Sequence, residues 1–304
     1  MNNLNLDEFI ELNSEWFDID LCYVNRNYVL ELHSYFKHAI NFKVEEWPIM
    51  LVVTDMETGR GPSAIGLKNQ DFARFLRIIK LSERIYLKER QLFITGGNNI
   101  LQLNWREGNP VSFAPVYKNT PLRTLLRSSN LYAEMLKRIE IPSPAAVLLD
   151  YPGGEIYFRR IIADNFRLVI LNIIEGNWTG SVEYIRNLSG LGRGLTPTGD
   201  DLIHSAFICA HYFIKDFSMK DIPENFISNI NLKTNEFGRH MIELGRSGKS
   251  PEVAIKYIIS LADGSVSEIY LNNLLAVGST TGFDLALGII YFIRILSSVK
   301  KLEI

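Results

Sequence analysis

The chain has 304 residues, of which 47% are hydrophobic and 22% charged, and this ordinary globular composition excludes extensive disorder. Its formal net charge of −2 excludes the strongly basic character expected of a nucleic-acid-binding domain. Two cysteines, Cys22 and Cys209, exclude a disulfide framework, and Cys209 lies in an apolar run where a buried thiol is expected.

Neither end of the sequence predicts a membrane or export signal. The first residues lack a basic segment followed by an apolar one, so no secretory signal is expected. The most apolar stretch, residues 285–296, is interrupted by Arg294 and is expected to be too short to span a bilayer. We therefore expect a cytoplasmic protein.

The first part of the chain is rich in short segments of β-branched and aromatic residues separated by turn formers. They predict strands over residues 28–33, 36–42, 49–54, 63–67, 91–94 and 100–105. Residues 71–81 have apolar side chains at helical spacing and predict one helix among the strands. Residues 54–62 are expected to form a surface hairpin between two strands, the alternative being that they reach a functional site.

Helical patterns dominate from Thr120 onward. Thr120 and Pro121 predict a cap followed by proline at the first helical position, with a helix over residues 122–139. Residues 155–175 are either helical throughout or strand in part. Further helices are predicted over residues 183–188, 201–217, 222–244, 251–261, 266–275 and 284–296.

Strands followed by helices predict an α+β fold and not alternating βαβ units. We expect a strand-rich domain over residues 1–118, with a twisted, mostly antiparallel sheet or open barrel, and a helical domain over residues 119–304. No low-complexity linker separates them, so the two parts can also share one core.

The helical part contains the segment Gly190-Leu-Gly-Arg-Gly-Leu-Thr-Pro-Thr-Gly-Asp-Asp201, whose last residues return in Thr281-Gly-Phe-Asp284. Both copies read Thr-Gly-x-Asp-Leu, and each precedes a helix that is apolar nearly all round and therefore buried. One interpretation is a capping box in each copy, in which the threonine and the aspartate satisfy the first amides of their own helix. That interpretation suits Thr281 and Asp284 well.

The first copy predicts more than a cap, because a capping box needs neither alternating glycines nor two adjacent aspartates. Glycines let backbone amides approach a ligand closely, and a helix start adds partial positive charge. Arg193 supplies a full charge that suits phosphate or carboxylate. The segment therefore predicts a small anion site, with ligand-binding residues Gly192, Arg193, Gly194, Thr196, Thr198 and Gly199 in the first copy and Ser279, Thr280, Thr281 and Asp284 in the second.

Asp200 and Asp201 are the candidate catalytic residues, because each can grip a ligand amide, take a proton or hold Mg²⁺ against a phosphate. No cofactor is predicted, and Mg²⁺ has no further support. The loop lacks the lysine of a Walker A loop, and its glycines lack the βαβ surroundings of a dinucleotide fingerprint.

The histidines give weaker indications. His204, one turn into the helix after Asp201, either lines the site as an acid or base or belongs to the core. His211 lies about 10.5 Å from it along the helix axis, so the two do not share a metal ion. No metal-ligand spacing involves His33, His38 or His240. Thr234 and Arg239 are candidate ligand contacts, although a solvated helix face is favoured for that segment.

The two motifs, Gly194-Leu-Thr-Pro-Thr-Gly-Asp-Asp201 and Gly278-Ser-Thr-Thr-Gly-Phe-Asp284 followed by Leu-Ala-Leu-Gly288, resemble the AllH-like family of bacterial proteins. That family was long a domain of unknown function with a loose label of carboxylase. The resemblance implies a role in anaerobic allantoin and purine breakdown, as a subunit of oxamate carbamoyltransferase. That enzyme converts oxalurate and phosphate into oxamate and carbamoyl phosphate.

The resulting hypothesis is a carbamoyltransferase subunit that binds phosphate, carbamoyl phosphate or oxalurate between the two Thr-Gly-x-Asp helix starts. We expect partner subunits or a homo-oligomer, and neither nucleic acid nor membrane as a partner. Two alternatives remain: a non-catalytic metabolite-binding or scaffold subunit, and a stand-alone carboxylase or hydrolase.

Overall fold

A computed structural model describes residues 8–24, 26–45, 47, 49–82, 84–96, 99–149, 160–215, 217, 222–223 and 226–301. The chain divides into two compact units between Phe113 and Ala114, whereas the sequence predicted the boundary after residue 118. Each unit has a hydrophobic core of its own. The α+β class is as predicted, with strands first and helices after.

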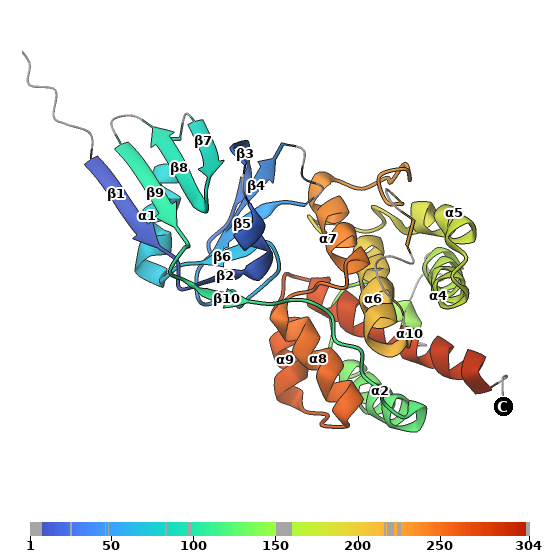
Figure 1. The fold of residues 1–304 in the computed structure, drawn as a ribbon. Helices are drawn as coiled ribbons and strands as arrows, with labels where there is room; N and C mark the ends of the chain where they lie inside the picture. Colours follow the sequence, from blue (N-terminus) through green and yellow to red (C-terminus); the bar gives the residue numbers. More distant parts are fainter. Residues whose placement is uncertain are drawn as a thin grey trace, which may run out of the picture. The chain divides into compact units, whose positions relative to one another are not determined.

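Unit 1 contains a curled ten-stranded mixed sheet and the helix α1 (Figure 1). The sheet order is β1-β9-β8-β7-β3-β4-β5-β6-β2-β10. The strands are β1 (Glu8–Asn13), β2 (Trp16–Asp18), β3 (Tyr28–Tyr35), β4 (Ala39–Val44), β5 (Leu51–Thr54), β6 (Ala64–Gly66), β7 (Arg84–Lys88), β8 (Gln91–Gly96), β9 (Asn99–Asn104) and β10 (Asn109–Val111). A 3₁₀ turn, Ile19–Tyr23, follows β2.

The sheet curls around α1 (Asn69–Ile79), whose buried face carries Phe72, Phe75, Ile78 and Ile79. The helix packs against β8 and β9, while the ring of Phe75 meets that of Phe42 on β4 edge to face at 6.3 Å. Three strands, β8, β7 and β3, lie between β9 and β4 in the sheet. One helix can contact both β9 and β4 because the sheet curls around it. Most neighbouring strands are antiparallel, as predicted; the parallel pairs are β1–β9, β5–β6 and β2–β10.

The parallel pairing of β5 with β6 overturns the prediction of a hairpin over residues 54–62, because a hairpin joins antiparallel strands. Residues 55–63 instead cross over and return to the same end of the sheet. Asp55 in this crossover is buried, with an exposed fraction of 4%.

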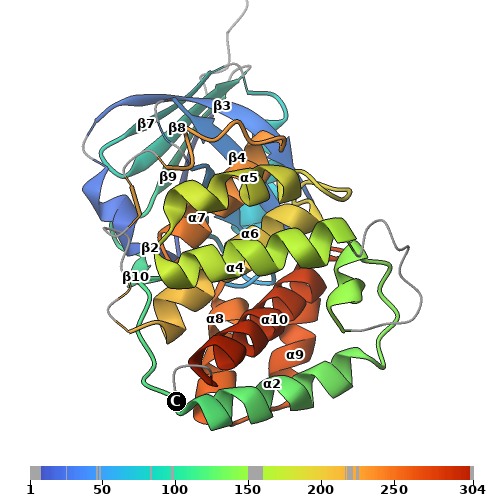
Figure 2. The same ribbon diagram turned by 90° about the vertical axis from the view of Figure 1, so that its right-hand side faces the viewer.

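Unit 2 is built from helices around α10 (Thr281–Lys301), which packs against α6, α2, α4 and α9 (Figure 2). The helices are α2 (Leu122–Leu136), α4 (Asn165–Glu175), α5 (Trp178–Leu188), α6 (Thr198–Phe213), α7 (Glu236–Arg246), α8 (Glu252–Asp263) and α9 (Glu268–Leu275). A 3₁₀ turn, Pro144–Leu149, and a π-helical turn, Arg160–Asp164, complete the described part of this unit.

Several predicted helix limits are wrong. Pro121 and not Thr120 is the cap residue of α2, which ends at Leu136. The helix predicted over residues 222–244 is reduced to α7, because turns occupy the described residues before it and the side chain of Asn235 caps α7 by accepting from the Gly238 amide at 2.8 Å. Of the ambiguous segment 155–175, residues 155–159 lie outside the described residues and residues 165–175 are helical.

The prediction that the apolar stretch around residues 285–296 is too short to span a bilayer is also wrong on length. The helix α10 begins at Thr281 and continues to Lys301. By length and composition alone, its residues 281–300 are long and apolar enough to cross a membrane, with a mean hydropathy of 1.6. However, 72% of that window is buried inside the structure, as in the core helix of a globular unit.

Candidate functional site

The two Thr-Gly-x-Asp segments converge, although 83 residues separate them in sequence. The hydroxyl of Thr196, just before α6, lies 2.6 Å from the hydroxyl of Thr281 at the start of α10. The hydroxyl of Thr198 donates to Oδ2 of Asp284 at 2.9 Å. The starts of α6 and α10 therefore lie together, and the positive ends of two helix dipoles share one place.

The glycine of each copy has the same packing role. A Cβ atom on Gly199 would lie 1.8 Å from the carbonyl oxygen of Leu188 at the end of α5. A Cβ atom on Gly282 would lie 1.8 Å from the carbonyl oxygen of Leu274 in the last turn of α9. In both copies, glycine is required because the helix start packs directly onto the backbone of the preceding helix end.

The two connecting loops also share a hydrogen bond but differ in length. The Gly199 amide donates to the Leu191 carbonyl at 2.8 Å, and the Gly282 amide donates to the Val277 carbonyl at 3.0 Å. Between these partners lie residues 192–198 in the first copy and 278–281 in the second, so the first loop is longer by three residues. The sequence echo is thus a repeated local structure, and the first copy carries extra chain.

The helices cross at equivalent positions of the two copies. Ser205 lies four residues after Asp201, and Gly288 lies four residues after Asp284. A Cβ atom on Gly288 would lie 2.0 Å from the hydroxyl of Ser205, so the two helices touch there. Contact between equivalent residues is what a local two-fold relation between the copies predicts.

The capping-box interpretation fails for both copies within the described residues. Pro197 is the cap residue of α6 and offers no side-chain acceptor. The hydroxyls of Thr198 and Thr281 are instead used in contacts with the other copy. The threonines therefore join the two helix starts to each other, which a motif read in one sequence segment does not reveal.

Asp200 holds the surrounding backbone together. Its Oδ1 accepts from the Gly190 amide at 2.9 Å, and its Oδ2 accepts a short hydrogen bond from the hydroxyl of Thr234. A Cβ atom on Gly238 would lie 2.1 Å from that Oδ2, so α7 also passes close by. Burial raises the pKa of Asp200 to about 6, against the opposing effect of the two hydrogen bonds.

Asp284 is also fully engaged. Besides the bond from Thr198, its Oδ1 accepts a short hydrogen bond from Ser143, which precedes the turn Pro144–Leu149. Burial raises its pKa to about 6. Sequence reasoning missed Ser143, because nothing in its surroundings connects it with a residue 141 positions later.

Asp201 is the exception among the three aspartates. It is fully buried, and neither of its carboxyl oxygens accepts a hydrogen bond of good geometry among the described residues, although the hydroxyls of Thr196 and Thr281 lie close enough to act against the rise of its pKa. Burial raises its pKa well above the ordinary value, and the nearby charges of Asp284 and Asp200 raise it further. A buried carboxyl group without well-formed hydrogen bonds is costly, so it indicates either a structural acid kept neutral or a place where a ligand supplies better contacts.

The loop between α5 and α6 offers unused backbone donors. Gly190, Gly192 and Gly194 have φ angles of +74°, +115° and +102°, a region that favours glycine. Among the described residues, the amides of residues 192–196 donate no hydrogen bond to protein acceptors. Arg193 is exposed on this loop, and Ser279 is exposed on the loop before α10, with Thr280 half-buried beside it.

His204 is held by partners outside the site. Its Nδ1 lies 2.7 Å from the Met241 carbonyl oxygen, and its Nε2 lies 2.9 Å from the hydroxyl of Ser250. Burial lowers its pKa to about 4, so the ring is neutral at pH 7. These contacts favour the core interpretation of His204 over a role as acid or base.

A cavity of about 470 Å³ lies beside the second copy. Its lining is mostly apolar and comprises Leu136, Ile139, Glu140, Ile141, Pro142, Ala146, Leu149 and Phe283. Phe283 is the residue between the glycine and the aspartate of the second motif. None of the three buried aspartates lines this cavity.

The aspartates do not form an evident metal centre. Among the described residues, His38, Asp55 and Glu57 of unit 1 are the group of three histidine, cysteine or carboxylate side chains whose ligand atoms all lie within 4.8 Å of one another. The arrangement in unit 2 instead combines unused amides, two helix starts and one buried acid without a well-formed hydrogen bond. Such a combination can bind an anion that also carries a neutral hydrogen-bonding group.

Comparison with known protein families finds a match, which covers this part of the chain. The family model described as oxamate carbamoyltransferase subunit AllH matches residues 188–293, which is 106 of the 304 residues. No curated protein and no solved structure matches the chain. The matched segment begins at the last residue of α5 and contains both Thr-Gly-x-Asp copies. Over residues 188–293 the chain is therefore similar to the AllH family.

Proposed function

We propose that the chain is a subunit of an oxamate carbamoyltransferase and that it binds a small anion with a terminal carboxamide where α6 and α10 begin. The observation that carries this proposal is the convergence of the two Thr-Gly-x-Asp copies around the fully buried Asp201, whose carboxyl oxygens accept no hydrogen bond of good geometry among the described residues. The family match over residues 188–293 supports the subunit assignment.

The loop suits the anionic end of such a ligand. The amides of residues 192–196 are unused, and glycines at residues 192 and 194 leave room for close backbone approach. The start of α6 adds partial positive charge, and Arg193 adds a full one within the same loop. Phosphate and carboxylate groups both fit these donors.

Asp201 suits the carboxamide end. Because its pKa is raised, the side chain is favoured in its neutral form, which offers one O–H donor and one carbonyl acceptor. A carboxamide offers an acceptor and a donor in the reverse order, so the two groups can pair through two hydrogen bonds. Carbamoyl phosphate, oxamate and oxalurate all carry this group together with a negative charge. Since Asp201 is fully buried, such pairing requires the loop of residues 190–197 to move.

In the proposed reaction, a phosphate oxygen forms a bond to the carbamoyl carbon of oxalurate. The bond from that carbon to the inner nitrogen breaks, and this nitrogen receives the proton released by phosphate, giving oxamate and carbamoyl phosphate. Backbone amides aimed at an anionic substrate lower the cost of the charge that develops in such a step.

A non-catalytic binding subunit is the second candidate function. It is favoured by the fact that Asp200 and Asp284 have both carboxyl oxygens engaged in contacts that hold the loops and helices together. In that case this chain binds the metabolite and a partner subunit supplies the reacting groups.

Thermal unfolding with phosphate, carbamoyl phosphate, oxamate or oxalurate tests the binding proposal, with acetate at equal ionic strength as the control. Ligand saturation at a hundred times Kd is expected to add about 2.7 kcal/mol of stability. Absence of any shift, alone and with partner subunits, would overturn the site. Turnover by the isolated chain supports the enzyme. Turnover that requires a mixture with partner subunits, and that persists when Asp201→Asn replaces the wild-type chain, supports the binding subunit.

A further inference from the structure

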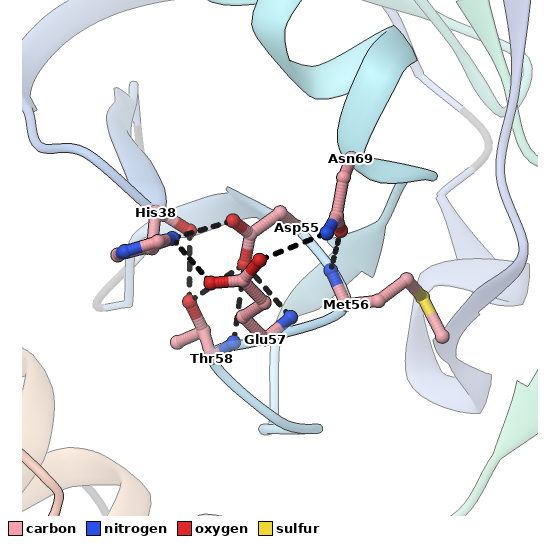
Figure 3. A network of polar contacts seen from close by, with 6 residues as sticks. All are labelled: His38, Asp55, Met56, Glu57, Thr58 and Asn69. Atoms are coloured by element: carbon pink, nitrogen blue, oxygen red, sulfur yellow. Dashed lines mark hydrogen bonds and ion pairs between the residues drawn. The ribbon is translucent and has the colours of Figure 1, made fainter.

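A second polar cluster lies in unit 1, where β4 and β5 run side by side (Figure 3). His38 directly precedes β4, and Asp55 directly follows β5. Because these strands are antiparallel and Ala39 pairs with Thr54, the residues just outside this pair lie together. Glu57 follows in the crossover to β6.

Hydrogen bonds fix the carboxyl group of Asp55. Its Oδ1 accepts from the amides of Glu57 and Thr58 at 3.0 and 3.1 Å and from the hydroxyl of Thr58 at 3.1 Å. Its Oδ2 points to Nδ1 of His38 at 2.6 Å. Burial acts to raise the pKa of Asp55, but the bonds from His38, Thr58 and Glu57 outweigh it and lower the pKa, so the carboxyl group is ionised at pH 7.

Glu57 is oriented in the same manner (Figure 3). Its Oε1 accepts from the side-chain amide of Asn69 at 3.0 Å, while its Oε2 lies 3.7 Å from Nδ1 of His38. Asn69 is the first residue of α1 and also accepts from the Met56 amide at 3.3 Å. Each carboxylate therefore gives one oxygen to protein donors and directs the other toward the same imidazole nitrogen.

We propose that His38, Asp55 and Glu57 form a binding site for a divalent transition-metal ion, such as Zn²⁺. The ligand atoms are Nδ1 of His38, Oδ2 of Asp55 and Oε2 of Glu57, which all lie within 4.8 Å of one another. One nitrogen and two carboxylate oxygens form a ligand set that such ions accept. The hydrogen bonds to the outer carboxylate oxygens are the kind of supporting contacts that orient metal ligands.

Metal binding needs only a small local change. Ligand distances of about 2.0–2.2 Å in tetrahedral geometry place neighbouring ligand atoms roughly 3.3–3.5 Å apart. The contact between His38 and Asp55 therefore widens from 2.6 Å, and that between His38 and Glu57 shortens slightly from 3.7 Å. The side chains of His38 and Glu57 are 34% and 61% exposed, so water can occupy a fourth position.

Isothermal titration of the full chain with Zn²⁺ tests this site. We expect His38→Gln and Glu57→Gln each to weaken Zn²⁺ binding at least about tenfold, while the control His33→Gln, on the neighbouring β3, leaves it unchanged. Glu57→Gln alters an exposed side chain, so it keeps the test decisive if His38→Gln unfolds. No Zn²⁺ binding by the wild-type chain, or binding by both variants as tight as that of wild type, would overturn the proposal and leave His38 and Asp55 as a hydrogen-bonded pair.

Discussion

Lowering the pH from about 7 to about 5 is expected to relieve the cost of burying three aspartates in unit 2, against an opposing loss from the buried His204 and His240, whose pKa values are lowered to about 4 and about 3. Asp200 and Asp284 each have a pKa of about 6 in the folded chain, whereas an unfolded aspartate titrates near about 3.9. The difference of about 2 pKa units, at about 1.4 kcal/mol per unit, means that each ionised carboxyl group costs roughly 3 kcal/mol of folding free energy. The raised pKa of Asp201 acts in the same direction.

The sign follows from proton binding. Since the folded state binds these protons more tightly than the unfolded state, the cost is fully present above about pH 6 and disappears as the pH falls toward about 4. Asp201→Asn keeps the shape of the side chain and removes the need to take up a proton on folding. We therefore expect this variant to be more stable than wild type at pH 7 and to lose this advantage as the pH falls.

Urea unfolding followed by far-ultraviolet circular dichroism measures this effect, because most described helices belong to unit 2 and α1 alone represents unit 1. Because the histidines are common to both chains, the free energy of unfolding of Asp201→Asn minus that of wild type is expected to fall as the pH falls from about 7 to about 5. A difference that grows as the pH falls would refute the reasoning. If the free energy of unfolding changes with pH equally in wild type and Asp201→Asn, then Asp201 does not have the raised pKa inferred from its burial.

Three further changes separate packing, polar contacts and ligand binding. Gly199→Ala is expected to cost about 1–3 kcal/mol or more in urea unfolding, because its Cβ meets backbone, whereas the control Gly61→Ala, with open space around it, changes stability by less than about 0.5 kcal/mol. Thr198→Val leaves an oxygen of buried Asp284 without its donor and is expected to cost about 1–3 kcal/mol; a smaller loss would contradict the bridging role. Arg193→Gln is expected to preserve the unfolding free energy within about 0.5 kcal/mol but to reduce the phosphate-induced shift in Tm, and an unchanged shift would remove Arg193 from the site.

The fold class and most elements could be predicted from periodicity, since strands and helices in this chain have clear apolar patterns. Strands β2 and β7 and the edge strands β1 and β10 were missed. The crossover of residues 55–63 was misread as a hairpin, because turn residues do not reveal whether the next strand is parallel. The helix predicted over residues 222–244 begins too early, since residues 226–235 are not helical, and only the capping role of Asn235 marks the start of α7.

The candidate site was only half visible in the sequence. The repeated Thr-Gly-x-Asp pattern identified the right segments, but capping explained its second copy equally well. The decisive contacts, from Thr196 to Thr281 and from Thr198 to Asp284, join residues about 85 positions apart and depend on how α6 and α10 cross. His38 showed no ligand spacing for the same reason, since strand pairing and not sequence distance brings it to Asp55.

Hydrogen–deuterium exchange across residues 188–201 tests the central proposal most directly, with and without carbamoyl phosphate. The amides of residues 192–196 have no protein acceptors among the described residues, so they are expected to exchange rapidly in the free chain. Binding of the anion at this loop predicts strong protection of these amides by carbamoyl phosphate and none by acetate. Unchanged exchange here at concentrations where binding is detected elsewhere would contradict the proposed site.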